Sequence, residues 1–85
     1  MRGKFREKLA DLCHRQWSGW MRYMFEKSVR NPDGTITIPK ELVDRWDRQV
    51  RTDYLLLPAD EMESDRKEAD KFLELIAEDY LEDSK

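Results

Sequence analysis

The stretch FREKLADLCHRQWSGWMRYMF, residues 5–25, repeats its apolar side chains at the spacing of an α-helix. A repeat of about 100° per residue gathers these side chains on one broad face. The stretch therefore predicts a long first helix over residues 4–27, in which Gly19 is a mild weakness. The apolar face of this helix consists of Phe5, Leu9, Leu12, Cys13, Trp17, Trp20 and Met24.

A turn and a short strand follow the first helix. In Asn31-Pro-Asp-Gly34, Pro32 presets its own backbone angle and Gly34 tolerates a positive φ, which is typical of a turn. Thr35-Ile-Thr-Ile38 alternates apolar and polar residues as a short strand does. The chain contains no obvious second strand. We therefore expect residues 35–38 to pair with the loop at residues 54–57 or with another subunit.

Two more helices are predicted after this strand. Pro39 is placed to open a second helix over residues 40–51, and a third follows Pro58 over residues 59–81. Between them, Thr52-Asp-Tyr-Leu-Leu-Leu-Pro58 has the composition of a buried connector, and residues 82–85 are expected to form a flexible tail. The apolar stripes are Leu42, Val43, Trp46 and Val50 on the second helix, and Met62, Ala69, Phe72, Leu73, Ile76 and Tyr80 on the third.

The sequence thus predicts a mainly α fold, a three-helix domain with one short β-strand or hairpin near residues 35–38. At 85 residues the chain is expected to form a single domain, residues 1–85, and to bury only roughly 60% of its unfolded surface. Three Trp, three Tyr and three Phe supply large apolar area in a chain that is 41% charged. The core should therefore be thin and rich in aromatic side chains.

Cysteine use and hydropathy indicate a cytoplasmic protein. Cys13 is the only cysteine, so an internal disulfide is excluded and a reducing compartment fits. No apolar run approaches the roughly 20 residues that span a bilayer, and the basic start is not followed by the apolar region of a signal peptide. We expect no membrane partner.

The net charge of −3 conceals two oppositely charged ends. Residues 1–30 carry eight Lys and Arg against three acids, whereas residues 58–85 carry four against eleven. Such ends can pair within one chain or between copies. The chain lacks the basic balance of a nucleic-acid binder, so neither DNA nor RNA is expected as a partner.

The second helix carries a possible ligand-binding stripe. Arg45, Gln49 and Thr52 follow one another at helical spacing beside Trp46, with Arg48 on the outer side. A guanidinium can hold a phosphate, an amide can bind a base edge, and an indole can stack on a planar ring. The alternative is an ordinary solvated helix face.

The third helix contains the stretch EMESDRKEADKFLELI, residues 61–76. In this stretch Asp65 and Arg66 lie beside the apolar stripe. One interpretation is a structural ion pair in which Asp65 orients Arg66. The other is an Arg66 that grips a phosphate or carboxylate through two hydrogen bonds.

The remaining chemical groups give weaker signals. His14 and Trp17 lie along the edge of the first helix, where a histidine is commonly a hydrogen-bonding residue at the border of the core. Cys13 points roughly 100° away from His14, which argues against a thiol–imidazole pair. The acid pairs Glu41 with Asp44 and Asp65 with Glu68 have the spacing by which helical pyrophosphohydrolases hold Mg²⁺, but such pairs arise easily in an acidic chain. We expect no metal site and no cofactor.

Several of these segments resemble a known family. Leu9-Ala-Asp-Leu-Cys-His14 with Trp17, then Thr52-Asp-Tyr-Leu-Leu-Leu-Pro58, Glu61 and Ser64-Asp-Arg-Lys-Glu-Ala-Asp70 resemble the small helical repeat domain of ryanodine receptors, which also occurs in bacterial and phage proteins. Residues 38–49 are similar to the middle of short phage and prophage proteins. Asp33-Gly-Thr-Ile-Thr-Ile-Pro39 stands where the receptor repeats carry a turn with Gly and Trp.

The resemblance implies a non-catalytic binding module. It suggests a phage protein in the host cytoplasm that captures a nucleotide-derived signal of a defence system, as a homo-oligomer whose subunit boundary shapes the site. The expected ligand-binding residues are His14, Trp17, Arg45, Trp46, Arg48, Gln49, Tyr54 and Arg66.

Two other functions remain open at this point. The excess of acids near the C-terminus favours a module that inhibits or recruits a basic host protein through the third helix. The acid pairs leave a Mg²⁺-dependent nucleotide pyrophosphohydrolase as a further alternative.

Overall fold

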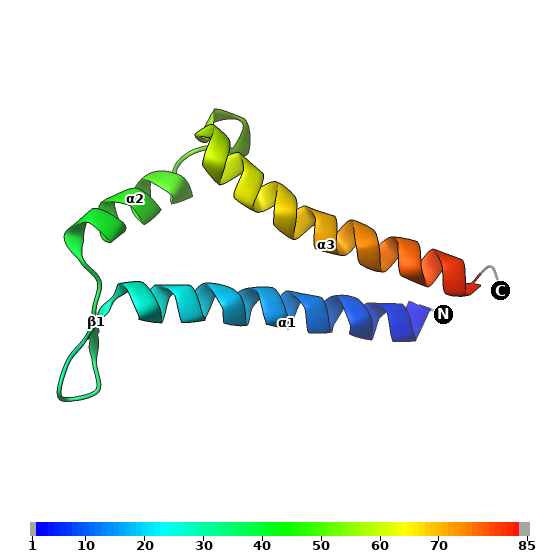
Figure 1. The fold of residues 1–85 in the computed structure, drawn as a ribbon, viewed down its shortest axis with the longest axis horizontal. Helices are drawn as coiled ribbons and strands as arrows, with labels where there is room; N and C mark the ends of the chain where they lie inside the picture. The colour runs from blue at the N-terminus through cyan, green and yellow to red at the C-terminus, as the bar shows by residue number, and fades with distance from the viewer. Residues whose placement is uncertain (1, 84–85) are drawn as a thin grey trace.

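The computed structural model describes residues 2–83 and shows three helices joined by a small hairpin and a short 3₁₀ turn (Figure 1). The predicted mainly α, three-helix domain with a short β segment is confirmed. Of the predicted tail at residues 82–85, residues 82 and 83 end the last helix, and residues 84–85 lie outside the described part. The elements are α1 (Arg2–Lys27), β1 (Val29–Arg30), β2 (Ile36–Thr37), α2 (Lys40–Val50), η1 (Tyr54–Leu56) and α3 (Ala59–Asp83).

The hairpin corrects the predicted pairing of the strand. β2 pairs antiparallel with β1, in the register Val29 with Thr37 and Arg30 with Ile36, and not with residues 54–57, which contain the η1 turn. The turn at residues 31–34 brings the two strands together. Its Gly34 has a φ of 89° and donates its N–H to the Asn31 carbonyl at 3.0 Å. The local turn thus supplies the partner strand that the sequence pattern did not reveal.

Two prolines fix where α2 and α3 begin. The carbonyl of Pro39 accepts hydrogen bonds from the N–H groups of Leu42 and Val43, at 3.0 and 3.1 Å. The carbonyl of Pro58 does the same for Glu61 and Met62, both at 3.0 Å. Because the residue before a proline avoids the helical conformation, the chain bends immediately before each helix.

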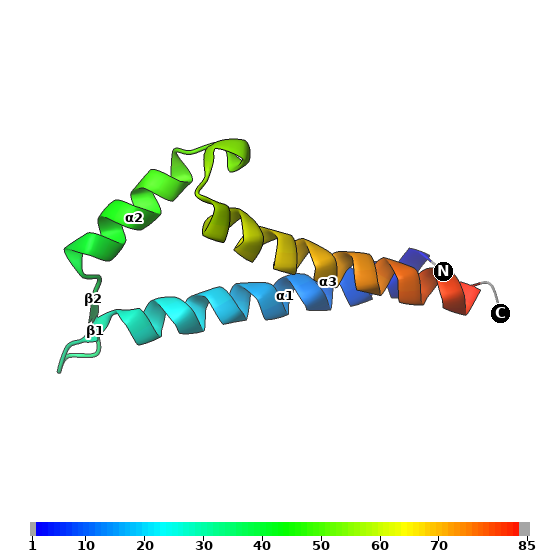
Figure 2. The ribbon, with the colours of Figure 1, turned by 45° about the horizontal axis from the view of Figure 1, so that its top comes forward.

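α1 and α3 lie antiparallel and form a two-helix layer (Figures 1 and 2). Near the chain ends Lys8 Nζ donates to Glu82 Oε2 at 3.0 Å, and this hydrogen bond raises the pKa of Lys8. Midway along the layer, Gln16 Nε2 donates to the Glu68 carbonyl at 3.2 Å. Beyond this point the two helices diverge, and α2 bridges the open end (Figure 1).

The core of this layer is very thin. Leu12, at 5% exposure, is the only hydrophobic side chain among the described residues that is fully buried. The chain measures 53 × 35 × 16 Å, and its radius of gyration is 17.2 Å, whereas a compact chain of this length has about 12 Å. A single copy is therefore an open arrangement of helices with little interior.

The connector and the apolar stripes differ from the predictions accordingly. Residues 52–58 were expected to be buried, but Leu55 and Leu56 are exposed. The predicted stripe of α3 divides in two. Phe72 is half-buried, whereas Leu73, Ile76 and Tyr80 are exposed. Leu75, which the stripe did not include, is half-buried and lines one depression together with Leu12.

Leu12→Ala should lower the free energy of unfolding by about 2–5 kcal/mol, because it removes the single fully buried aliphatic side chain in the described chain. Urea denaturation followed by circular dichroism measures this loss. Leu55→Ala is the matched control, since the exposed Leu55 should change stability by no more than about 0.5 kcal/mol. Equal losses in the two variants would contradict the assignment of Leu12 as the centre of the core.

Candidate functional site

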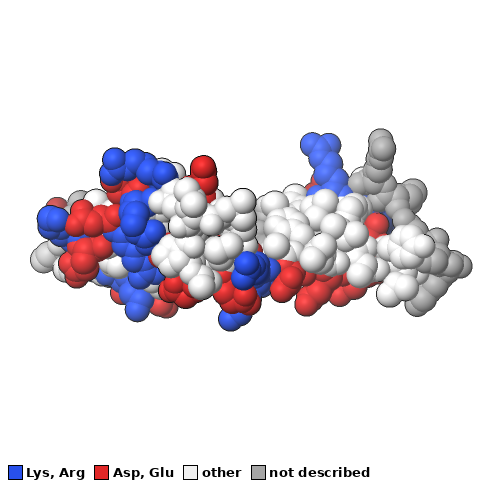
Figure 3. Space-filling view, turned by 90° about the horizontal axis from the view of Figure 1, so that it is seen from above, with Lys and Arg blue, Asp and Glu red and all other residues white. Residues whose placement is uncertain are grey.

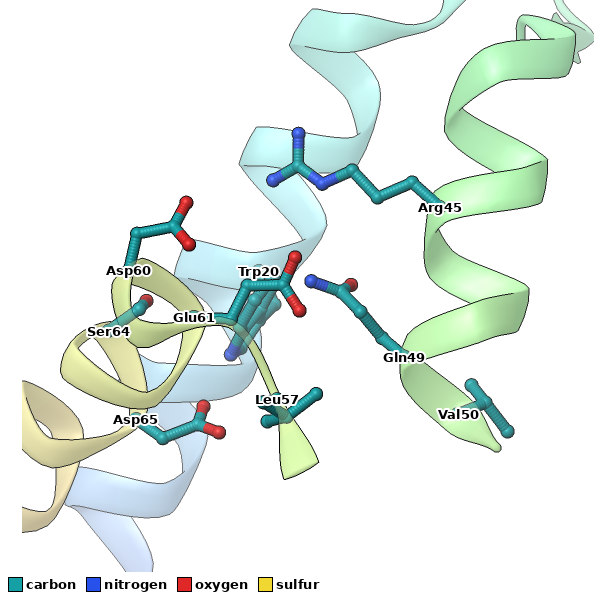
Figure 4. A pocket seen from close by; sticks show the side chains of 9 residues that line it. All are labelled: Trp20, Arg45, Gln49, Val50, Leu57, Asp60, Glu61, Ser64 and Asp65. Carbon is teal, nitrogen blue, oxygen red and sulfur yellow. The ribbon is translucent and has the colours of Figure 1, made fainter. Parts of the chain in front are cut away.

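A cleft bordered by all three helices contains several of the predicted site residues (Figure 4). It consists of two cavities of about 350 and 390 Å³, which adjoin because they share three lining residues. These three are Trp20 from α1, Arg45 from α2 and Ser64 from α3. Cavities of this size lie at the lower end of the range for small-molecule sites.

One half of the cleft is rich in acceptors. Asp60, Glu61 and Asp65 come from the first turns of α3, and Gln49 faces them from α2 (Figure 4). Residues 60 and 61 belong to the first turn of α3, where a negative charge interacts favourably with the positive end of the helix. This half can therefore accept hydrogen bonds from amino and imino groups of a ligand.

An ion pair holds the α2 and α3 walls of the cleft together. Arg48 Nη2 donates to Glu61 Oε2 at 2.6 Å, and the Glu61 side chain is only 13% exposed. The Arg48 hydrogen bond is the main cause that lowers the pKa of Glu61, and the Gln49 amide and the charges of Arg48 and Arg45 lower it further.

The second oxygen of this carboxylate is not satisfied by a hydrogen bond. Glu61 Oε1 is buried and makes no hydrogen bond of normal geometry, although the Gln49 amide is directed toward the carboxylate (Figure 4). An ordered water or a ligand donor could occupy this position. Arg48 itself is paired with Glu61, so it supports the wall of the cleft and is not available to bind an anion.

Arg45 is the cation that the cleft leaves available. Its side chain extends from α2 across the cleft toward α1 (Figure 4). Within residues 2–83 it forms no ion pair, whereas Arg15, Arg48, Arg51 and Arg66 each pair with an acid. A guanidinium without a carboxylate partner in a concave site is suited to a phosphate or carboxylate of a ligand.

The other half of the cleft is basic and aromatic. Arg15 and Lys71 line it together with Arg45, and the Trp20 and Tyr23 rings meet edge to face with centroids 6.2 Å apart. Arg15 pairs with Asp11 at 3.0 Å and Lys71 with Glu68 at 3.0 Å, both as exposed pairs within one helix. The cleft thus has acceptors at one end, three cations and the carboxylate of Glu68 at the other, and an indole between them.

The predicted ligand-binding residues separate into two groups. Arg45 and Gln49 line the cleft, and Arg48 supports it through Glu61. Trp46 lies in an adjoining apolar depression, where its ring is 6.3 Å from that of Tyr23. These four residues lie on α2, where the spacing along one helix made their proximity predictable.

The remaining predicted residues lie outside the cleft. His14 and Trp17 stack on each other with centroids 6.0 Å apart on an exposed part of α1, and Tyr54 is exposed on η1. Arg66 pairs with Glu63 at 3.5 Å, not with Asp65, so the predicted Asp65–Arg66 ion pair is wrong. The physical reason is helical geometry, since adjacent residues point about 100° apart while residues three apart share a face.

Sequence reasoning missed several residues of the cleft. Trp20 was assigned to the core but borders the cleft while half-exposed, and Asp60 and Ser64 were not singled out. One signal was available for Glu61. It lies just after the connector and Arg48 lies just before it, so opposite charges at the facing ends of two helices indicated their pairing.

The acid pairs considered for Mg²⁺ are not brought together as a metal site. Asp44 pairs with Lys40 at 2.6 Å, and Glu68 pairs with Lys71. Within residues 2–83 there is no group of three or more His, Cys, Asp or Glu side chains that could hold a metal ion. Among the helices described here, none is both long and apolar enough to cross a membrane.

Comparisons with known proteins add no assignment. No protein-family model matches the chain, and neither a curated protein nor a solved structure matches it significantly. The function must therefore be argued from the cleft and the exposed faces of the helices.

Glu61→Gln should reduce the loss of stability in acid. Because the pKa of Glu61 is lowered in the folded chain, its ionised form stabilises the fold above roughly pH 4.5, and this contribution disappears as the pH falls through and below that value. Urea midpoints measured from pH 7 down to pH 3 should fall less steeply for Glu61→Gln than for the unchanged chain.

Glu63→Gln is the matched control for this measurement, since Glu63 is an exposed glutamate of the same helix turn. It should follow the unchanged chain over the whole pH range. A parallel acid profile for all three proteins would show that the Arg48–Glu61 pair does not hold the cleft.

Proposed function

We propose that the protein is a non-catalytic binding module that holds a nucleotide-derived signalling molecule in the cleft between its three helices. The observation that carries this proposal is the guanidinium of Arg45, which reaches into the cleft without an ion-pair partner among the described residues. Acceptor groups lie on one side of it and further cations on the other.

The phosphate of such a ligand fits the basic half. Arg45 can bind a phosphate through two parallel hydrogen bonds, and Arg15 and Lys71 lie in the same half as additional cations. Both are held by exposed pairs with acids, and such pairs contribute only about 0–1 kcal/mol. Their exchange for a phosphate therefore costs little.

The base of the ligand fits the acceptor half. The carboxylates of Asp60 and Asp65 and the hydroxyl of Ser64 can bind amino and imino groups, and Trp20 offers a ring face between the two halves. A carboxylate accepts hydrogen bonds but repels phosphate, so the arrangement also sets the direction of the ligand in the cleft.

The resemblance of residues 9–17 and 52–70 to the ryanodine receptor repeat supports the same class of function. A free-standing module of this kind needs only to bind its ligand tightly, and we propose that it acts by capturing a signal in a phage-infected cell. Arg45, Gln49 and Trp20 are the residues proposed to contact the ligand, while Arg48 and Glu61 hold the walls in place.

Isothermal titration against cyclic nucleotides and ADP-ribose derivatives tests this proposal. At least one member should bind, and Arg45→Ala should weaken its binding by about 10- to 150-fold, which corresponds to the loss of a charged hydrogen bond. Arg45→Lys should recover little, because a lysine cannot form the paired hydrogen bonds.

Arg66→Ala is the control for this titration, because Arg66 is an exposed arginine outside the cleft and should leave binding unchanged. Incubation of the unchanged protein with Mg²⁺ and the bound nucleotide should return the nucleotide intact. Absence of heat with every ligand, using protein of full helical content, would overturn the proposal, and hydrolysis would replace it with the pyrophosphohydrolase.

A further inference from the structure

The chain exposes far more surface than a closed domain of its mass. Its accessible surface is 7242 Å², whereas a compact monomer of 10.3 kDa exposes about 5,400 Å². The difference of roughly 1,800 Å² is more than twice the ~800 Å² that each partner buries in a standard protein interface. An excess of this size therefore points to a large interface, of the kind that obligate homodimers form.

Part of the exposed apolar surface lies on the α1–α3 layer. Trp17 on α1 and Leu73 on α3 are 60% and 62% exposed, and Ile76 is 47% exposed. Cys13 is exposed beside Trp17 on α1. α1 meets α3 through Leu12 and Gln16, and α3 meets α1 through Glu68 and Leu75, so neither set of exposed residues belongs to the contact between the two helices.

Helical geometry places both sets on the same side of the layer. On α1, Cys13 and Trp17 are rotated about the helix axis by about 100–140° from Leu12, which faces α3. On α3, Ile76 and Leu73 are rotated in the same sense, by a similar angle, from Leu75, which faces α1. Because the helices are antiparallel, equal rotations turn the two stripes to the same side. Figure 3 views the layer edge-on, from above, and shows basic and acidic side chains intermixed at its left end and uncharged surface bordered by acidic side chains toward the chain ends.

The distribution of charge along the chain indicates which partner fits this face. Residues 1–30 hold eight Lys and Arg against three acids, and residues 58–85 hold eleven acids against four basic residues. Consider a second copy that is related to the first by a two-fold axis parallel to the helices. The basic start of its α1 then lies over the acidic end of the first copy's α3, and by symmetry the first copy's α1 lies over its α3. An axis across the helices would instead place acidic α3 on acidic α3.

We propose that a second copy of this chain covers the α1–α3 face formed by Cys13, Trp17, Leu73 and Ile76, with each α1 packed on the partner's α3 in a two-fold, four-helix arrangement. Arg15 of the cleft lies on the opposite side of the layer, so the pairing leaves the basic half of the cleft open. The pairing does not depend on a ligand. A dimer that binds no nucleotide would therefore remove the proposed function and leave this inference intact.

Cys13 reports directly on the pairing, because it is the only cysteine and is exposed in a single copy. Alkylation by iodoacetamide should be about tenfold slower at protein concentrations where the dimer dominates than at concentrations where it dissociates. Light scattering should give twice the chain mass over the same range, and the melting temperature should rise with concentration.

Ile76→Asp and Val43→Asp form a matched pair for this test. Their side chains are 47% and 46% exposed on helices, but only Ile76 lies on the proposed face. Ile76→Asp should abolish the concentration dependence of mass, melting and alkylation, whereas Val43→Asp should retain all three.

Two results would overturn the inference. A chain that stays monomeric, with fast Cys13 alkylation and a constant melting temperature at all concentrations, would leave this face for a different partner. A dimer that Ile76→Asp does not weaken and that leaves Cys13 reactive would place the second copy elsewhere. If Ile76→Asp fails to fold, the concentration dependence of the unchanged chain still decides between a dimer and a monomer.

Discussion

The ion pair between Arg48 and Glu61 links α2 directly to α3, and the cleft depends on it. Glu61 is well covered, so the loss of Arg48 would leave a carboxylate with neither a cation nor full hydration. The pair also restricts the path of the eight-residue connection between α2 and α3, in which Leu55 and Leu56 are exposed. Arg45 and Gln49 reach the cleft only because this pair fixes the helix that carries them.

A second constraint follows from chain length. An 85-residue chain that places its helices in one layer can cover only one side of each helix, and here only Leu12 becomes fully buried among the described residues. Folding of small domains is marginal even when about 60% of the surface is removed from water. Residual apolar stripes on both helices of the layer are therefore a sign of missing contacts rather than of ordinary surface composition.

The sequence predicted the helices well because their signals are local. Pro39, Pro58 and Gly34 act on the backbone within one turn, and the apolar repeats cover two or more turns of each helix. The arrangement of the helices was not predictable in this way. Trp20 enters the cleft only through contacts between elements far apart in the chain, and no local pattern distinguishes it from Trp17, which does not border the cleft.

The third helix shows why its apolar stripe was misassigned. At about 100° per residue, Ile76 lies about 40° from Phe72 and Leu73 about 100° from Phe72, so with Leu75 these apolar side chains form one arc of about 160°. Contact with α1 leaves Phe72 and Leu75 half-buried and covers only part of this arc, so Leu73 and Ile76 remain exposed. Asp65 lines the cleft near the start of the helix, and Arg66 pairs with Glu63. An apolar arc wider than one neighbour covers is typical of a helix that packs against two neighbours, and a single copy of this chain supplies only one of them.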